Sequence, residues 1–322
     1  MKVLIMTVLA ALALNSGAAA QEKPIAFGGG QTGSSNFAAN ASIARILSQQ
    51  GGLNVRVLSY GGVGSYFPLI NTGELDFAAI TFPAVLEAMT GVGTFEGRKQ
   101  ENIRLVARLM PQYVGIFVRK TSPIKQLSDL KGTRVTWGLV SQPTQIYQML
   151  SMLAAGGIGP NDVIQVPAPS IVRGVDDFAA GRTDSGFFSL GGGRLVEADT
   201  QVGGIRFLPI PDGPEAVAAL RKYTAGAYVV RREPRQGQVG IGEATNVFAY
   251  DYVFVAGAHI ADETIVRVLK LIADHEKELI ESAPVMRDLD AKNMAKDLEG
   301  LPYHPGAIKY FKEIGQWPPK RG

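Results

Sequence analysis

The sequence predicts an α/β protein built from two similar units. Short β-rich runs alternate with helical runs, a pattern typical of mostly parallel sheets covered by helices. The pattern restarts after residue 120, and a constant spacing links the halves: Gly73 to Gly181 and Asp76 to Asp184 are both 108 residues apart. A ligand cleft is expected between the units, because open α/β sheets bind ligands beyond the carboxyl ends of their strands.

Each unit is expected to contain three strands and two helices. In the first unit the strands cover residues 23–27, 53–60 and 76–81, and the helices cover 36–50 and 65–73. In the second unit the strands cover 133–138, 162–168 and 184–190, and the helices cover 144–157 and 171–181. Three further elements follow: a long strand at 244–257 that returns to the first domain, an amphipathic helix at 262–282, and a turn with a short helix at 301–315.

The N-terminus predicts export. Met1 and Lys2 precede an apolar run from Val3 to Leu14, and Ala18-x-Ala20 offers a signal-peptidase site. The run is shorter than the roughly 20 residues of a membrane span. Residues 1–20 are therefore interpreted as a signal peptide cleaved after Ala20, and the periplasm is the expected location. The mature chain then divides into domain 1, at 21–120 plus 245–322, and domain 2, at 121–244.

Composition excludes several classes of protein. There is no cysteine, so disulfides, thiolate chemistry and a lipid-anchoring cysteine are absent. The chain has 32 basic and 29 acidic residues, without a clustered basic face, which argues against nucleic acid as a partner. Three scattered histidines and no catalytic motif predict that the protein is not an enzyme, and no catalytic residue, metal or cofactor is expected. A monomer is expected.

Gly28, Gly30 and Gly33 have the G-x-G-x-x-G spacing of a dinucleotide-binding turn. A ribose-binding acid should follow by about 20 residues, but no acidic residue lies between Glu22 and Glu74. We therefore expect a different anion at this loop. The N-terminus of a helix presents free backbone N–H groups and a partial positive charge.

The second unit repeats this arrangement, since a strand ends at Gly138 and a polar loop opens the next helix. Two such loops facing one cleft predict a small organic anion, a carboxylate or acidic amino acid, held from both sides and enclosed by hinge motion. Arg194 follows a strand and a glycine run, so its guanidinium is a candidate carboxylate partner. The predicted ligand-binding residues are Gln31, Thr32, Gly33, Ser34, Ser35, Asn36, Thr81, Phe82, Ser141, Gln142, Thr144, Gln145, Phe188 and Arg194.

Several segments resemble the TAXI family, the solute receptors of tripartite ATP-independent periplasmic (TRAP) transporters. They are "GGGQTGSSNFAANASIARILS", "NTGELDFAAIT", "DLKGTRVTWG", "GRTDSGFF" and, most specifically, "LPYHPGAIKYFKEIG". The resemblance covers about residues 24–315. It implies a type II periplasmic binding protein fold, with two α/β domains, a cleft and two hinge strands. It also implies membrane-embedded TRAP permease subunits as partners, ion-gradient-driven uptake, and ligands such as glutamate, glutamine or 2-oxoglutarate.

The chain departs from the family pattern at both loops. The family's first loop resembles T-G-S-T-G-G-T-Y-Y-P, where this chain has "GGGQTGSSNFA", and its Q-S-D after the third strand is replaced by Thr81-Phe82-Pro83. A carboxylate other than glutamate therefore stays open, with Phe82, Phe187 or Phe188 facing it. Two alternative functions stay open. One is a ligand-sensing receptor with the same cleft and a membrane signalling protein as its partner, and the other is an exported enzyme.

Overall fold

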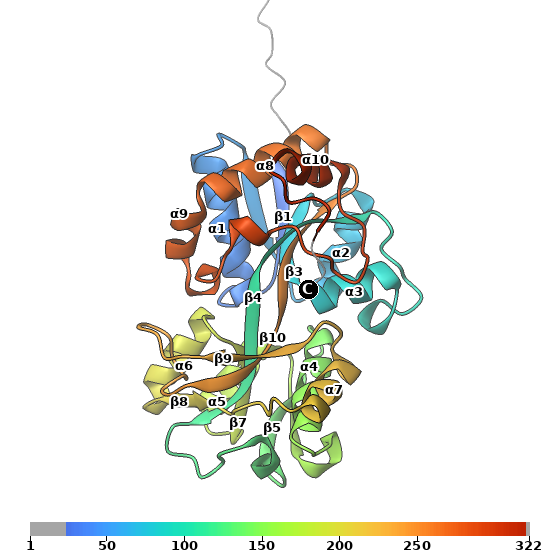
Figure 1. Ribbon diagram of the computed structural model, residues 1–322. Helices are drawn as coiled ribbons and strands as arrows, with labels where there is room; N and C mark the ends of the chain where they lie inside the picture. Colours follow the sequence, from blue (N-terminus) through green and yellow to red (C-terminus); the bar gives the residue numbers. More distant parts are fainter. Residues whose placement is uncertain (1–23, 320–322) are drawn as a thin grey trace, which may run out of the picture.

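The computed structural model describes residues 24–319, which form two lobes joined by long strands (Figure 1). The predicted signal peptide lies outside the described residues. The strands follow one another through the sheet in the order β2-β1-β3-β10-β4-β7-β5-β6, with β8 beside β4 and β9 beside β10. This is the α/β architecture, with two lobes, that the sequence predicts.

The first lobe contains the N-terminal unit and the C-terminal helices. Its strands are β1 (Ile25–Gly29), β2 (Val55–Ser59) and β3 (Phe77–Thr81), together with parts of β4 (Ile103–Arg119) and β10 (Thr245–Gly257). Its helices are α1 (Ser35–Gln49), α2 (Val63–Thr72), α3 (Phe82–Thr90), α8 (Asp262–Asp274), α9 (Glu276–Ser282) and α10 (Pro305–Glu313).

The second lobe repeats the βαβαβ order. Its strands are β5 (Arg134–Gly138), β6 (Ile164–Ala168), β7 (Ser185–Ser189), β8 (Ile205–Phe207) and β9 (Tyr228–Arg232). Its helices are α4 (Thr144–Ala155), α5 (Ile171–Ala179), α6 (Gly193–Val202) and α7 (Pro214–Tyr223).

The internal repeat is confirmed by a shared hydrogen-bond pattern. In the first lobe the Asp76 carboxylate accepts from the Ala26 amide at 2.7 Å, and in the second the Asp184 carboxylate accepts from the Arg134 amide at 2.8 Å. Both the donors and the acceptors are 108 residues apart, the spacing found in the sequence. Each aspartate precedes the third strand of its unit and satisfies an amide of the first strand, so the same residue type is needed at both places.

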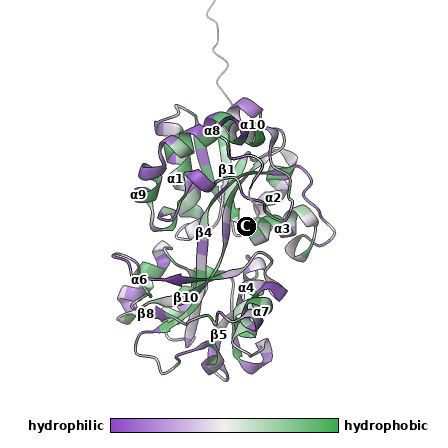
Figure 2. Cartoon of the chain, in the orientation of Figure 1, coloured by the Kyte–Doolittle hydropathy of each residue, from purple (hydrophilic) through white to green (hydrophobic). Residues whose placement is uncertain are grey.

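β4 and β10 connect the lobes. They pair antiparallel from Ile103 to Val114, with register shifts along β10 between Tyr252 and Val253 and between Phe254 and Val255. The lobes have separate hydrophobic cores, and the change from one to the other falls between Met110 and Tyr113 on β4. Figure 2 shows apolar segments in both lobes. The predicted domain boundaries near residues 120 and 245 remain a proposal.

Several expectations about the elements were wrong or incomplete. Each unit has more helices than the two expected, and the elements that were not anticipated include α3, α6, α7, β8 and β9. The helix expected at 262–282 is divided at His275 into α8 and α9. β4 was not anticipated, because its apolar run is continuous on both faces within the cores and lacks the alternation that marks a half-buried strand. It is nonetheless the second of the two long strands that cross between the lobes.

Candidate functional site

A cavity of ≈ 60 Å³ lies where the two lobes meet. Both lobes and both connecting strands contribute to its wall. The residues that line it are Gly30, Ser34, Ser35, Asn36, Gly62, Val63, Tyr66, Ile80, Thr81, Gln112, Val114, Gln142, Thr144, Gln145, Ile171, Phe187, Ser189, Tyr250 and Tyr252.

The beginnings of five helices reach the cavity. In the first lobe they are those of α1, α2 and α3, and in the second those of α4 and α5. The N-terminus of an α-helix carries a partial positive charge and backbone N–H groups without helical acceptors. None of the described residues that line the cavity has a charged side chain. The electrostatic character of the cavity is therefore set by helix ends and neutral dipoles.

The glycine-rich loop of the first lobe is held by its own side chains. Ser34 is the N-cap of α1: its hydroxyl accepts from the Phe37 amide at 3.1 Å and donates to the Gln31 carbonyl at 2.6 Å. The side-chain oxygen of Asn36 accepts a hydrogen bond from the Gly30 N–H. The side-chain NH2 group of Asn36 donates to the carbonyl of Ala79. These contacts fix the entry to α1 without a ligand.

The corresponding loop of the second lobe is held in a similar way. The Gln142 side chain accepts from the Ile171 amide at 2.9 Å and so satisfies the first N–H of α5. The Ser141 hydroxyl donates to the carbonyl of Pro169 at 2.6 Å, which turns it away from the cavity. Thr144 and Gln145, in the first turn of α4, remain on the cavity wall.

The lobes contact each other beside the cavity. The hydroxyls of Ser35 and Ser189 are 2.5 Å apart, and the Gly33 carbonyl accepts from the Arg194 amide at 3.4 Å. Gly62 lies against the backbone of Ser141 so closely that a Cβ at residue 62 would overlap the Ser141 carbonyl oxygen. The structure is therefore a closed arrangement of the two lobes.

Three buried tyrosines supply hydroxyls to the cavity wall. Tyr252 donates to the Ala79 carbonyl at 3.1 Å, and Tyr250 donates to the Gln148 side chain at 3.1 Å. The buried Tyr66 hydroxyl has no acceptor for its proton among the described residues, although the Asn36 side chain lies beside it as a donor and lowers its pKa against the effect of burial. Burial raises the pKa of all three phenols, so they are neutral donors at physiological pH.

The opposite face of the two connecting strands is charged. Asp251 is on β10 between the two cavity-facing tyrosines, and its buried carboxylate lies 3.1 Å from Arg108 and 2.7 Å from Lys296. It also accepts from the Tyr228 hydroxyl at 3.2 Å. Alternation along the strand thus separates a neutral front face from an ionic back face.

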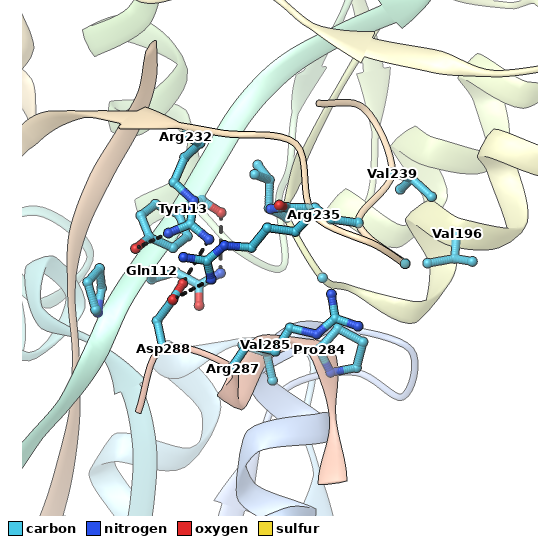
Figure 3. Close-up of a pocket in the computed structure, with 15 residues that line it drawn as sticks. Gln112, Tyr113, Val196, Arg232, Arg235, Val239, Pro284, Val285, Arg287 and Asp288 are labelled. Atoms are coloured by element: carbon cyan, nitrogen blue, oxygen red, sulfur yellow. Dashed lines mark hydrogen bonds and ion pairs between the residues drawn. The ribbon is translucent and has the colours of Figure 1, made fainter. Parts of the chain in front are cut away.

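A second ionic group links the lobes at the flank of the connecting strands (Figure 3). Asp288, which follows α9, lies 3.0 Å from Arg232 and 2.8 Å from Arg235. The Arg232 guanidinium also lies over the Tyr113 ring, at 4.2 Å. Burial is the main cause that raises the pKa of Tyr113 to about 12, and the negative charge of Asp288 is the second. We call Arg232, Arg235 and Asp288 the interlobe ion cluster.

The structure brings half of the predicted binding residues to one cavity. These are Ser34, Ser35, Asn36, Thr81, Gln142, Thr144 and Gln145. The others are outside its wall: Gln31, Thr32, Gly33, Phe82, Ser141, Phe188 and Arg194.

The structure explains why two of these residues, Phe188 and Arg194, do not line the cavity. Phe188 points to the opposite side of β7 from Phe187, which lines the cavity, because neighbouring strand residues alternate. The Arg194 guanidinium is engaged by the carboxylates of Asp176 and Glu197, at 2.6 Å each. The geometry therefore does not support the expectation that Arg194 faces a ligand carboxylate, and a substitution at this residue tests it.

Several wall residues were missed. Gln112 and Val114 are on β4, and Tyr250 and Tyr252 are on β10. The alternation "YDY" at 250–252 was the available signal, since it places two tyrosines on one face of a strand. Tyr66, on α2, had no comparable signal.

The described part of the chain contains neither a metal-binding cluster nor a membrane-spanning helix. Within residues 24–319, no cluster of three or more His, Cys, Asp or Glu side chains is arranged to hold a metal ion. In the same part of the chain, no helix has the length and apolarity needed to cross a membrane.

Solved structures share this fold at low sequence identity. PhnD1 from Prochlorococcus marinus, in complex with methylphosphonate, has a TM-score of 0.55 and 12% identity, covering 91% of this chain and 99% of its own. The binding component of an ABC phosphonate transporter from Pseudomonas aeruginosa has a TM-score of 0.53 and 12% identity, covering 80% and 78%. The periplasmic aliphatic sulphonate binding protein SsuA from Escherichia coli has a TM-score of 0.50 and 14% identity, covering 90% and 78%.

These similarities establish the two-lobe fold of periplasmic binding proteins. A family model described as the NMT1-like family matches residues 27–315, which is nearly the whole described chain. The chain therefore belongs to the NMT1-like family.

Proposed function

We propose that this protein is a periplasmic solute-binding receptor that captures a small organic anion and delivers it to a membrane transporter. One observation carries the proposal: helix N-termini from both lobes line a single cavity, and none of the described residues on its wall has a charged side chain. An anion is the solute that such an environment favours, because its charge is met by oriented backbone dipoles. The fold, shared with binding proteins for a phosphonate and a sulphonate, supports the same class of ligand.

The partner we propose is a TRAP-type permease. The support is the sequence resemblance to TAXI receptors, especially "LPYHPGAIKYFKEIG". The fold similarity to ABC-transporter proteins is at 12–14% identity and does not select a transporter class. Uptake in whole cells separates the two: collapse of the ion gradient abolishes TRAP-driven uptake, whereas ATP depletion at a maintained gradient abolishes ABC-driven uptake.

The receptor proposal is tested on the mature protein after removal of any co-purified solute. A ligand at 100 times its Kd stabilises the folded state by about 2.7 kcal/mol, which gives a clear rise in melting temperature. We expect such a rise with at least one small carboxylate, sulfonate or phosphonate, without chemical turnover. A broad screen of organic anions in which no compound binds would contradict the proposal. Turnover of a bound compound would point to an enzyme.

A further inference from the structure

We infer that the site takes an oxyanion that carries no ammonium group, and that the Tyr66 hydroxyl donates a hydrogen bond to it. This inference rests on the proposed receptor function and narrows its ligand class. It departs from glutamate, an acidic amino acid and the ligand type that the sequence resemblance implies. Two features of the cavity support it: its charge and the state of Tyr66.

The first feature is the lack of a counter-charge for an amine. The polar groups on the cavity wall are hydroxyls, amides and helix N-termini, and none of its described residues is an aspartate or glutamate. A buried ammonium needs a paired carboxylate or several well-placed acceptors, because leaving water costs several kcal/mol. The helix N-termini add a partial positive charge, which further disfavours a cation. An α-amino acid would therefore place a carboxylate in the cavity, which the helix N-termini favour, and also an ammonium group, which they disfavour.

The second feature is the unused hydrogen-bond donor of Tyr66. This side chain is 1% exposed and lines the cavity, yet its hydroxyl proton has no acceptor among the described residues. The Asn36 side chain lies beside the hydroxyl but acts on it as a donor, since it lowers the Tyr66 pKa against the effect of burial, and its carbonyl oxygen already accepts from Gly30. A buried donor left without an acceptor is unfavourable. A ligand oxygen in the cavity would accept this hydrogen bond.

The position of Tyr66 explains the first glycine of the G-x-G-x-x-G spacing. A Cβ at Gly28 would lie 2.6 Å from Cδ2 of the Tyr66 ring, so any larger residue at position 28 would displace the ring. The ring is also packed edge-on against Phe67, with centroids 5.3 Å apart. The first glycine of the motif therefore makes room for an aromatic donor at the cleft.

Matched pairs of ligands test the charge. Calorimetry on solute-free protein would compare pyruvate with alanine, acetate with glycine, methanesulfonate with aminomethanesulfonate, and 2-oxoglutarate with glutamate. We expect at least one amine-free member to bind at least tenfold more tightly than its amino partner. Equal or tighter binding of the amino partners would overturn the inference while leaving the receptor proposal intact.

Tyr66→Phe tests the donor. The variant removes only the hydroxyl, so we expect affinity for the best amine-free anion to fall about tenfold to hundredfold, as for a hydrogen bond to a charged group. The melting temperature of the ligand-free variant should stay the same or rise, because an unpaired buried group is removed. Tyr303→Phe is the matched control: this hydroxyl lies outside the cleft and donates to the Lys296 carbonyl at 2.8 Å. The Tyr303→Phe variant should be less stable than the original protein and should bind the anion with unchanged affinity. Unchanged affinity in Tyr66→Phe would remove Tyr66 from the site.

Discussion

The carboxylate of Asp288 lies 3.0 Å from the guanidinium of Arg232 and so ties the C-terminal segment of the first lobe to the end of β9 in the second (Figure 3). Arg232 is buried, and Arg235 adds a second contact to the same carboxylate at 2.8 Å. The interlobe ion cluster is separate from the cavity, although Gln112 on β4 borders both. Contacts of this kind favour the arrangement of lobes in which they form.

Asp288→Asn should therefore weaken ligand binding without touching the ligand. Loss of the charge leaves Arg232 and Arg235 to repel each other and lowers the population of the closed state, and apparent affinity falls in proportion. For a partly exposed ion pair worth about 1 kcal/mol, the expected loss is about fivefold. Calorimetry measures the affinity, and small-angle scattering should show a larger radius of gyration for the ligand-free variant. Asp290→Asn is the control, since that carboxylate bonds only within its own segment. Identical affinity in both variants would mean that the cluster does not bias closure.

Gly62→Ala should block closure directly. A methyl group at residue 62 would overlap the Ser141 carbonyl oxygen of the opposite lobe, whereas the extended backbone at Gly62 tolerates any residue. We expect ligand affinity to fall at least tenfold with little change in the free energy of unfolding. Gly64→Ala is the control, because its Cβ would make an ordinary contact of 3.5 Å with Thr94. If Gly62→Ala binds as well as Gly64→Ala, the closed arrangement is not required for binding.

Arg194→Gln should change ligand affinity by less than about threefold. The guanidinium is paired with Asp176 and Glu197 and does not line the cavity, and partly exposed pairs of this kind contribute about 1 kcal/mol or less to stability. Calorimetry with the same anions used for Tyr66→Phe checks this prediction. A tenfold or greater loss would show that Arg194 reaches the ligand after all.

Protonation of His304 should make the protein less stable in mild acid. His304 is the N-cap of α10, where its Nδ1 accepts from the Gly306 amide at 3.2 Å, and burial lowers its pKa below the usual 6.5 although Asp262 opposes this. The unfolded chain therefore takes up a proton at His304 near pH 6.5, whereas the folded chain takes it up only at a lower pH. The contribution of neutral His304 is fully present above that pH and is lost as the pH falls toward the folded-state pKa.

His304→Asn isolates this effect, because asparagine keeps the helix cap and does not titrate. Urea unfolding at about pH 7.5 and about pH 5 would be compared for both proteins. We expect the original protein to lose more unfolding free energy than the variant over this interval, since the other titrating groups cancel in the comparison. Equal losses would show that His304 is not responsible.

Much of the fold could be predicted from local patterns. The strands and helices of the two units, and the 108-residue spacing of Asp76 and Asp184, follow from periodicity and turn residues near each other in sequence. The polar loops at Ser34–Asn36 and Gln142–Gln145 also reach one cavity, because both open helices at the carboxyl ends of strands. The long strand β4 was missed, because a strand buried on both faces has no period in its apolar pattern.

By itself, then, the sequence determined the α/β class, the doubled unit and the polar loops, since these depend on interactions between residues close along the chain. Only the tertiary structure decided that the Tyr66 hydroxyl proton has no acceptor among the described residues, that Arg194 is occupied by two carboxylates, and that Tyr250 and Tyr252 complete the cavity wall. The physical reason is that partners of a side chain, and the face to which it turns, are set by contacts between distant segments. Those contacts depend on how β4 and β10 bring the two lobes together.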